Sequence, residues 1–201
     1  MNEWSPIPGE TPIDPSGLKT KGITNRRELS IAEAQNIRKT ITKYLAATPS
    51  KRTAPFSYDW CLRLHREMFG NVWKWAGIPR NVNLNLGVPY HLIGQKLAEL
   101  IDDLPHWSAS GMNLVEQAAR LHYRAVSIHP FENGNGRWSR LLANIWLRRH
   151  KHAIVVWSEE LIGDESAIRQ EYLDAVKQGD RGDLSALIDL HRRLLEVTSA
   201  D

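Results

Sequence analysis

The segment of this sequence with the most chemical potential covers residues 127–140 and reads SIHPFENGNGRWSR. Pro130 disfavours helix at His129, and Gly134 and Gly136 permit backbone angles and close approaches that a side chain would block. The pattern therefore predicts a loop that enters a helix, with unpaired N–H groups converging at the helix start. Because the positive end of the helix dipole lies at the same place, phosphate is the expected ligand.

Charged residues beside this loop complete a candidate site for phosphate transfer. Arg137 and Arg140 lie three positions apart in the expected helix, so they share a face and can both reach one polyphosphate chain. The imidazole of His129 is of a type that titrates near neutral pH, which suits it to accept a proton from an attacking hydroxyl. Such transfer depends mainly on positioning and electrostatics, so a base, an anion cradle, cations and Mg²⁺ would suffice.

The string HPFENGNGRWSR resembles the Fic motif of protein adenylylating enzymes, H-P-F-x-[DE]-G-N-G-R-x-x-R, and fits it at every position but one. LHREMFGNVWKWAG (Leu64–Gly77) and NLNLGVP are also similar to Fic (Fic/Doc) proteins, so the likeness extends over most of residues 30–150. The amino-terminal arm with GITNRREL further resembles the mobile mystery protein B subgroup, Fic-domain proteins associated with mobile elements. The resemblance implies a mainly α protein, a Fic-like helical bundle with one small β-hairpin flap.

In function, the resemblance implies a protein adenylyltransferase. It would move AMP from ATP to a Tyr, Ser or Thr hydroxyl of a target protein and release pyrophosphate. His129 would be the base, Arg137 would bind inner phosphates, and Arg140 would hold the γ-phosphate. Phe131 would be a buried anchor. The remaining residues assigned by resemblance are Gly134, Asn135 and Gly136 in the anion hole, and Leu84, Asn85, Leu86, Gly87 and Val88 in a flap that pairs with the target peptide.

The one departure from the motif concerns the metal. Asn133 stands where an acidic residue usually ligates Mg²⁺, and Glu132 stands one place earlier. An amide oxygen can ligate a hard cation, directly or through water, but it lacks the charge of a carboxylate. We therefore expect Mg²⁺ to bind weakly through Asn133, with Glu132 as a substitute only if the loop turns differently.

Two other activities stay open on the same fold. One is phosphotransfer in the manner of the Doc toxins, in which a lysine replaces the second loop glycine, and Gly136 argues against it. The other is a catalytically weak Fic-like module that binds nucleotide or a partner, which Asn133 favours. Thr24–Glu28 fits part of the inhibitory motif [ST]-x-x-x-E-[GN], but Leu29 follows the glutamate. The sequence thus favours a separate antitoxin-like inhibitor over self-inhibition by Glu28.

The elements around the motif are expected to be helical. Ser30 and Glu33 form a capping-box pattern that predicts a helix over 30–47, and Ser57 and Gly70 bound a second. We interpret His65, in the second helix, as surface or packing. Apolar periodicity predicts further helices over residues 92–107, 114–127, 134–150, 166–178 and 184–197. Alternation between Arg80 and His91 predicts the hairpin.

Composition bounds the domain count, partners and location. The 201 residues suit an arm (1–29) followed by one Fic-type domain with carboxy-terminal helices (30–201). A net charge of +3 without long charge runs does not favour nucleic acid as a partner. The lone Cys61, and the lack of a signal peptide or apolar span, predict a cytoplasmic protein without membrane contact. Oligomeric state is left open, a homo-oligomer included.

Overall fold

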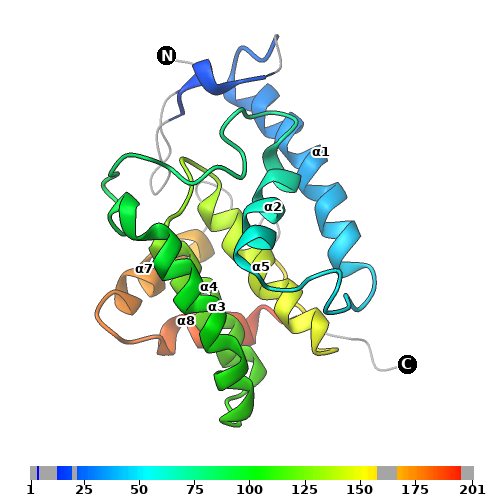
Figure 1. Ribbon diagram of the computed structural model, residues 1–201, viewed down its shortest axis with the longest axis vertical. Helices are drawn as coiled ribbons and strands as arrows, with labels where there is room; N and C mark the ends of the chain where they lie inside the picture. Colours follow the sequence, from blue (N-terminus) through cyan, green and yellow to red (C-terminus); the bar gives the residue numbers. More distant parts are fainter. Residues whose placement is uncertain (1–3, 5–12, 20–21, 158–166, 196–201) are drawn as a thin grey trace.

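The computed structural model describes Trp4 and residues 13–19, 22–157 and 167–195. Helices dominate these residues, which confirms the mainly α prediction (Figure 1). The helices are η1 (Pro15–Gly17), α1 (Arg26–Leu45), α2 (Tyr58–Phe69), η2 (Tyr90–Leu92), α3 (Ile93–Ala109), α4 (Leu114–Ile128), α5 (Asn135–Arg149), α7 (Ala167–Gly179) and α8 (Ser185–Arg193).

Helix α1 begins earlier than predicted, and the expected capping box is not formed. The side chain of Asn25 caps the helix by accepting a hydrogen bond from the Glu28 N–H. The carboxylate of Glu33 instead contacts Trp73 and Arg137, which are distant in sequence. A charge-assisted pair with an arginine is stronger than a bond to a local N–H group, so tertiary contacts determine where Glu33 points.

Helices α4 and α5 form the centre of the bundle and lie side by side (Figure 1). Helix α4 also packs against α3 and α8, while α5 packs against α1 and α2. Helix α2 begins at the predicted Ser57 cap, whose side chain accepts from the Trp60 N–H, and ends at Gly70. The core includes fully buried Trp60 and Trp138, and the Trp138 indole N–H donates to the Cys61 carbonyl at 3.2 Å.

The predicted hairpin between Arg80 and His91 is wrong, because residues 80–89 contain no strand. Their hydrogen bonds go elsewhere: the Val88 N–H donates to the Ile128 carbonyl at the end of α4, and the Arg80 side chain donates to the Val82 and Val88 carbonyls. The alternation of apolar and polar residues therefore reflects a loop that lies against α4, with no partner strand.

The described part of the arm docks on the segment that follows α2. Leu18 pairs with Trp73 in an isolated antiparallel bridge, the Lys19 N–H donates to Val72, and the Lys74 N–H donates to Gly17. The arm therefore covers the tryptophan-rich turn beside the bundle (Figure 1). The division into an arm and a domain stays a prediction.

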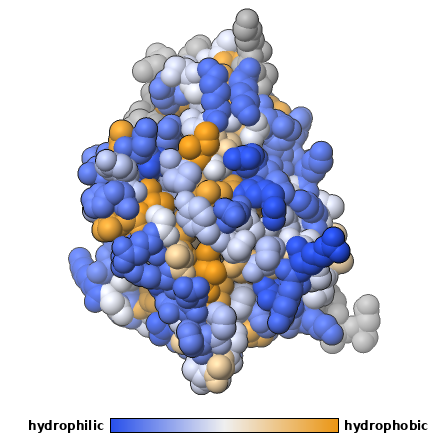
Figure 2. Space-filling model, in the orientation of Figure 1, coloured by the Kyte–Doolittle hydropathy of each residue, from blue (hydrophilic) through white to orange (hydrophobic). Residues whose placement is uncertain are grey.

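The surface in Figure 2 is mainly hydrophilic, with hydrophobic side chains exposed in separate patches. Several of the exposed large apolar residues come from the segment between α2 and α3, namely Ile78, Val82, Leu86 and Tyr90. Within the described residues, no helix is both long and apolar enough to cross a bilayer.

Candidate functional site

The predicted phosphate loop is a sharp turn from α4 into α5 with a left-handed residue at each end. His129 has φ 51° and ψ 60° at the end of α4, and Gly134 has φ 77° before α5. A Cβ on Gly134 would come within 2.7 Å of the Phe69 ring. Glycine is thus required at position 134 both by its backbone angle and by the packing of α2 against the loop.

Three side chains brace this turn from within. The Asn135 side chain accepts from the Phe131 N–H at 3.0 Å and donates to the Phe131 carbonyl at 2.8 Å. His65 accepts from the Gly77 N–H at Nδ1, so its Nε2 carries the proton and donates to the Asn133 carbonyl at 3.0 Å. Phe131 is fully buried, as predicted, and stacks on His65 with ring centres 3.6 Å apart.

His129 is buried at the end of α4 and uncharged at neutral pH. Burial, and then the nearby Arg80 guanidinium, lower its pKa from 6.5 to about 4, although a hydrogen bond to the Val126 backbone acts the other way. A neutral imidazole can accept a proton. The site thus provides the protonation state that a general base needs, at the cost of some basicity.

The predicted flap residues meet His129 through backbone contacts. Gly87 has φ 91°, and a Cβ there would come within 2.5 Å of the His129 Cβ and 2.9 Å of the Ile128 carbonyl. The other flap residues, Leu84, Asn85, Leu86 and Val88, are exposed or half-buried in the same loop. The flap therefore passes directly over the candidate base.

Arg80 connects the flap to the loop. This buried arginine donates from Nε to the His129 carbonyl at 2.8 Å and from its two terminal nitrogens to the Val82 and Val88 carbonyls. Its own N–H donates to the Pro130 carbonyl at 2.9 Å. One guanidinium thus fixes the position of the flap relative to the candidate base.

The start of α5 has the features of an anion cradle. The N-cap residue of α5 is Gly134, which has no side chain that could accept from the first N–H groups of the helix. The first N–H groups of a helix have no partner within it, so those of Asn135 and Gly136 can serve an anion. The Gly134 N–H, however, donates to the Asn133 side chain at 2.6 Å. The Asn135 side chain is already bonded to Phe131, so the group of Asn135 that can bind an anion is its backbone N–H.

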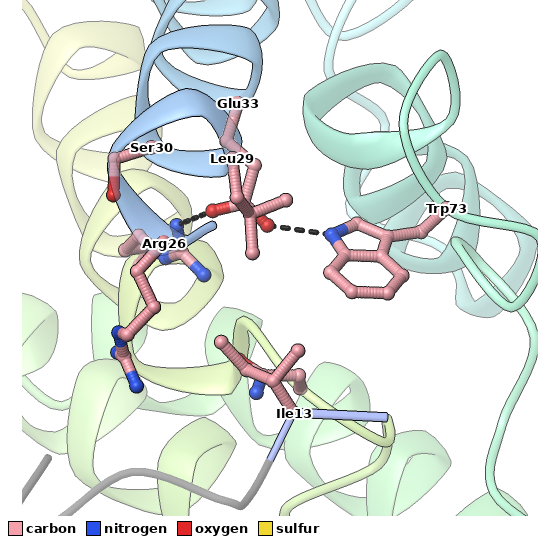
Figure 3. Close-up of a pocket in the computed structure, with 8 residues that line it drawn as sticks. Ile13, Arg26, Leu29, Ser30, Glu33 and Trp73 are labelled. Atoms are coloured by element: carbon pink, nitrogen blue, oxygen red, sulfur yellow. Dashed lines mark hydrogen bonds and ion pairs between the residues drawn. The ribbon is translucent and has the colours of Figure 1, made fainter. Parts of the chain in front are cut away.

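Arg137 is engaged by a carboxylate that the sequence did not indicate. The Glu33 carboxylate forms an ion pair with Arg137 through Oε2. Through Oε1 it accepts from the Trp73 indole N–H at 2.6 Å (Figure 3). The cavity beside this pair has a volume of about 50 Å³. Glu33 occupies one terminal nitrogen of Arg137, so a phosphate group that approaches from this cavity would compete with the Glu33 carboxylate for that nitrogen.

Arg140 contacts a different set of residues. Its guanidinium carbon is 5.7 Å from the Trp157 ring centre and 5.6 Å from the Tyr172 ring centre, both within cation–π range. Arg137, in contrast, contacts α1 and the Phe69 ring of α2. The two arginines that share a face in sequence therefore have partners on different sides of the bundle.

The two residues considered for the metal lie in different settings. The Asn133 amide oxygen already accepts from the Gly134 N–H, and Glu132 is exposed. Although Glu132 is exposed, its partial desolvation by neighbouring groups, and then the nearby Asp14 carboxylate, raise its pKa. Within the described residues, no group of three or more His, Cys, Asp or Glu side chains is arranged to hold a metal ion. Asn133 could offer a cation one neutral oxygen, and Mg²⁺ usually completes its coordination with waters and substrate phosphates.

Glu28, the glutamate of the partial inhibitory motif, bonds to a neighbour in sequence. Its carboxylate accepts from the Thr24 N–H at 2.7 Å and from the Thr24 hydroxyl at 3.1 Å, and these two bonds lower its pKa. Sequence reasoning missed Glu33, Arg80 and the bracing role of His65. A signal for His65 existed, because it lies on the same face of α2 as the buried Cys61 and Phe69. Nothing local marked Glu33 or Arg80.

Residues 55–147, which contain α2 to α5 up to Leu147, match the family model described as Fic/DOC family. This segment is a Fic/DOC domain. Protein adenylyltransferase fic-1 of Caenorhabditis briggsae is 32% identical over 144 residues, which make up 69% of this chain and 27% of that protein. Protein adenylyltransferase Fic of Drosophila grimshawi is 31% identical over 132 residues, 63% of this chain and 26% of that protein. The chain thus spans about a quarter of the length of these relatives.

Solved structures share the fold. A Fic-1 fragment from C. elegans has a TM-score of 0.69 and 26% identity, covering 89% of this chain and 52% of that one. BepC from Bartonella tribocorum, solved with bound AMPPNP, has a TM-score of 0.67 and 17% identity, covering 89% and 91%. These likenesses confirm the Fic-like helical bundle.

We predict that Arg80→Met lowers the free energy of unfolding of the Fic/DOC domain and raises the pKa of His129. Three carbonyls lose their donor, so the free energy of unfolding should fall by about 2–5 kcal/mol. Removing the adjacent cation should move the His129 pKa upward from about 4, measured by NMR titration of its imidazole.

The stabilising effect of a neutral His129 is full above pH 6.5 and is lost as pH falls towards 4, because the unfolded chain binds the proton first. Because Arg80→Met should raise the folded-state pKa of His129, it should narrow the pH range over which this stability is lost. Arg63→Met, an exposed arginine of α2, is the control. An unchanged or lower His129 pKa in Arg80→Met would contradict the assigned role of the guanidinium.

Proposed function

We propose that this protein is a protein adenylyltransferase that transfers AMP from ATP to a Tyr, Ser or Thr hydroxyl of a target protein and releases pyrophosphate. The observation that carries the proposal is the placement of a neutral, buried His129 between the flap backbone at Gly87 and the helix start at Gly134. The relatives named as protein adenylyltransferases support it. We further propose a cytoplasmic location and the mobile-element subgroup, as the sequence predicts.

In the proposed reaction, the hydroxyl oxygen of the target attacks the α-phosphorus while neutral His129 accepts the hydroxyl proton. A new oxygen–phosphorus bond forms, and the bond from the α-phosphorus to the bridging oxygen breaks, so that pyrophosphate leaves. The backbone N–H groups of Asn135 and Gly136, together with Arg137 and Arg140, would stabilise the negative charge. The flap at residues 84–88 would align the target peptide over His129 by backbone pairing.

Mg²⁺ belongs to the proposal as a weakly held ion that arrives with ATP. Asn133 would supply one neutral oxygen to it, and the phosphates would supply charged ones. When bound, the ion would neutralise phosphate charge. The AMPPNP complex of BepC supports an adenine nucleotide as the ligand of this fold.

Replacing His129 should slow the proposed reaction strongly. We expect His129→Ala to slow AMP transfer by about 10²–10⁴-fold, the usual contribution of a positioned base. The measurement is transfer from α-labelled ATP, followed by mass spectrometry of host lysate treated with parent and variant protein. His106→Ala, an exposed histidine of α3, should behave like the parent. Equal labelling by parent and His129→Ala, or a γ-phosphate mark in place of AMP, would overturn the proposal.

The Glu33–Arg137 pair also suggests how the activity is restrained within the chain. Glu33 is buried and its carboxylate occupies the guanidinium that would bind inner phosphates. We propose that Glu33 competes with ATP for Arg137, so that a shift of α1 would permit binding. An antitoxin-like protein remains a further proposed partner, and it could act by holding α1 in place.

Glu33→Gln is expected to increase ATP affinity and AMP transfer. The variant keeps an oxygen to accept from Trp73 but loses the charge that pairs with Arg137. An increase of about ten- to a hundredfold in ATP affinity corresponds to one charged hydrogen bond. Titration calorimetry measures this ATP affinity. Glu28→Gln makes the same chemical change on the same helix and is the control, because the Glu28 carboxylate bonds to Thr24. Weaker ATP binding by Glu33→Gln would show that Glu33 supports the site.

Asn133→Asp should strengthen the response to Mg²⁺. A carboxylate can still accept from the Gly134 N–H while it adds charge at the metal position. We expect half-maximal AMP transfer at a lower Mg²⁺ concentration, and tighter Mn²⁺ binding to the ATP complex by electron paramagnetic resonance. Gln35→Glu makes the same chemical change on the exposed face of α1. No shift in either measurement would remove Asn133 from the metal site.

A further inference from the structure

Buried polar side chains connect α4, α7 and α8 on the Arg140 side of α5. His122 and His191 are fully buried, and Tyr172 is 6% exposed. The His122 Nδ1 atom lies 3.3 Å from the His191 Nε2 atom, and the His122 Nε2 atom lies 3.2 Å from the Tyr172 hydroxyl. The His191 Nδ1 atom lies 2.8 Å from the Leu187 carbonyl oxygen. These contacts form a continuous hydrogen-bonded chain.

The direction of every bond in this chain follows from its last member. A carbonyl only accepts, so His191 carries its proton on Nδ1 and, being neutral, accepts at Nε2. His122 must therefore donate from Nδ1 and accept at Nε2, which obliges the Tyr172 hydroxyl to donate. Burial lowers the pKa of both histidines, that of His191 to about 4, so both are neutral at pH 7.

Because the Tyr172 proton points into this chain, its oxygen can act only as an acceptor towards α5. That oxygen lies 3.8 Å from the place where a Cβ on Gly136 would stand. The Arg140 guanidinium lies against the faces of Tyr172 and Trp157. The Trp157 ring in turn packs edge-on against Tyr172 and both histidines. The aromatic surface beside Arg140 is thus held in place from three helices.

We propose that Tyr172, oriented by His122 and His191, is a positioning residue that holds Arg140 ready for the terminal phosphates of ATP. The inference rests on the proposed function, in which Arg140 binds the γ-phosphate. An arginine side chain loses substantial rotamer entropy when it binds, and a preformed seat reduces that loss. Tyr172 and His191 lie outside residues 55–147, so the proposal makes α7 and α8 part of the nucleotide site.

The test compares nucleotides that differ in phosphate number. Tyr172→Phe keeps the ring but removes the hydroxyl that fixes it. We expect ATP binding to weaken about three- to tenfold, the value of one hydrogen bond, while AMP binding stays unchanged because AMP lacks the phosphates that reach Arg140. Titration calorimetry with ATP and with AMP measures the two affinities, and their ratio is the quantity compared between variants. Tyr123→Phe is the matched control, because the Tyr123 hydroxyl donates to Asp180 on the surface.

A second pair of variants separates orientation from loss of packing. His122→Gln retains an oxygen that can accept the Tyr172 proton, whereas His122→Leu does not. His122→Gln should preserve the ratio of ATP to AMP affinity, and His122→Leu should reduce it as Tyr172→Phe does. Cooperative thermal unfolding, followed by circular dichroism, identifies any variant that fails to fold.

The Arg140 Nε–H signal in an NMR spectrum, assigned with Arg140→Lys, tests the positioning without nucleotide. The neighbouring rings should shift this signal in the parent protein, and Tyr172→Phe should move it towards the value of a solvated arginine. If the parent protein binds no ATP, the proposed function fails, but the Arg140 signal still shows whether Tyr172 positions Arg140. An unchanged Arg140 signal, or equal effects on ATP and AMP, would overturn the proposal.

Discussion

The site depends on the sharp turn that carries the chain from α4 into α5. His129 and Gly134 both adopt left-handed angles, and for a non-glycine residue this costs roughly 1–3 kcal/mol. Side chains from elsewhere offset that cost: Asn135 closes the loop on Phe131, His65 holds the Asn133 carbonyl, and Arg80 holds the carbonyl of His129. His129 and the first residue of α5 are therefore separated by only five residues of braced loop. A looser connection would separate the candidate base from the anion cradle.

Helix α5 carries two cations that the protein controls in different ways. Arg137 is paired with a buried carboxylate from α1, so an anion that uses the same N–H group must displace a charge-assisted bond. Arg140 lies against the faces of Trp157 and Tyr172, and a cation–π contact of about 0.5–2 kcal/mol uses none of the N–H donors of the guanidinium. These aromatic contacts can therefore persist while Arg140 binds phosphate. We infer that α1 sets whether nucleotide binds, and that α7 and α8 set how well it is aligned.

The sequence predicted the elements that local chemistry determines. Ser57 and Gly70 bound α2 as expected, and Pro130 with Gly134 marked the loop, because caps and backbone restrictions act over a few residues. The predicted start of α1 was wrong because the Asn25 side chain caps the helix earlier and Glu33 pairs with Arg137. The flap was wrong as a hairpin because its hydrogen bonds go to α4 and to the Arg80 side chain. Contacts across such sequence distances leave no periodic pattern, so Glu33, Arg80 and Tyr172 could not be assigned to the site from the sequence.

These long-range contacts mean that the motif does not define the site by itself. Glu33 precedes the segment that matches the Fic/DOC family, and Tyr172 and His191 follow it, yet all three act on residues of α5 or beside it. Substitutions in α1, α7 or α8 can therefore alter phosphate binding while every residue of the motif stays unchanged. Under the proposed function, a partner that displaces α1 would act on Arg137 through Glu33, whereas the aromatic contacts of Arg140 come from Tyr172 and Trp157. The proposed activity would then respond to a contact on α1.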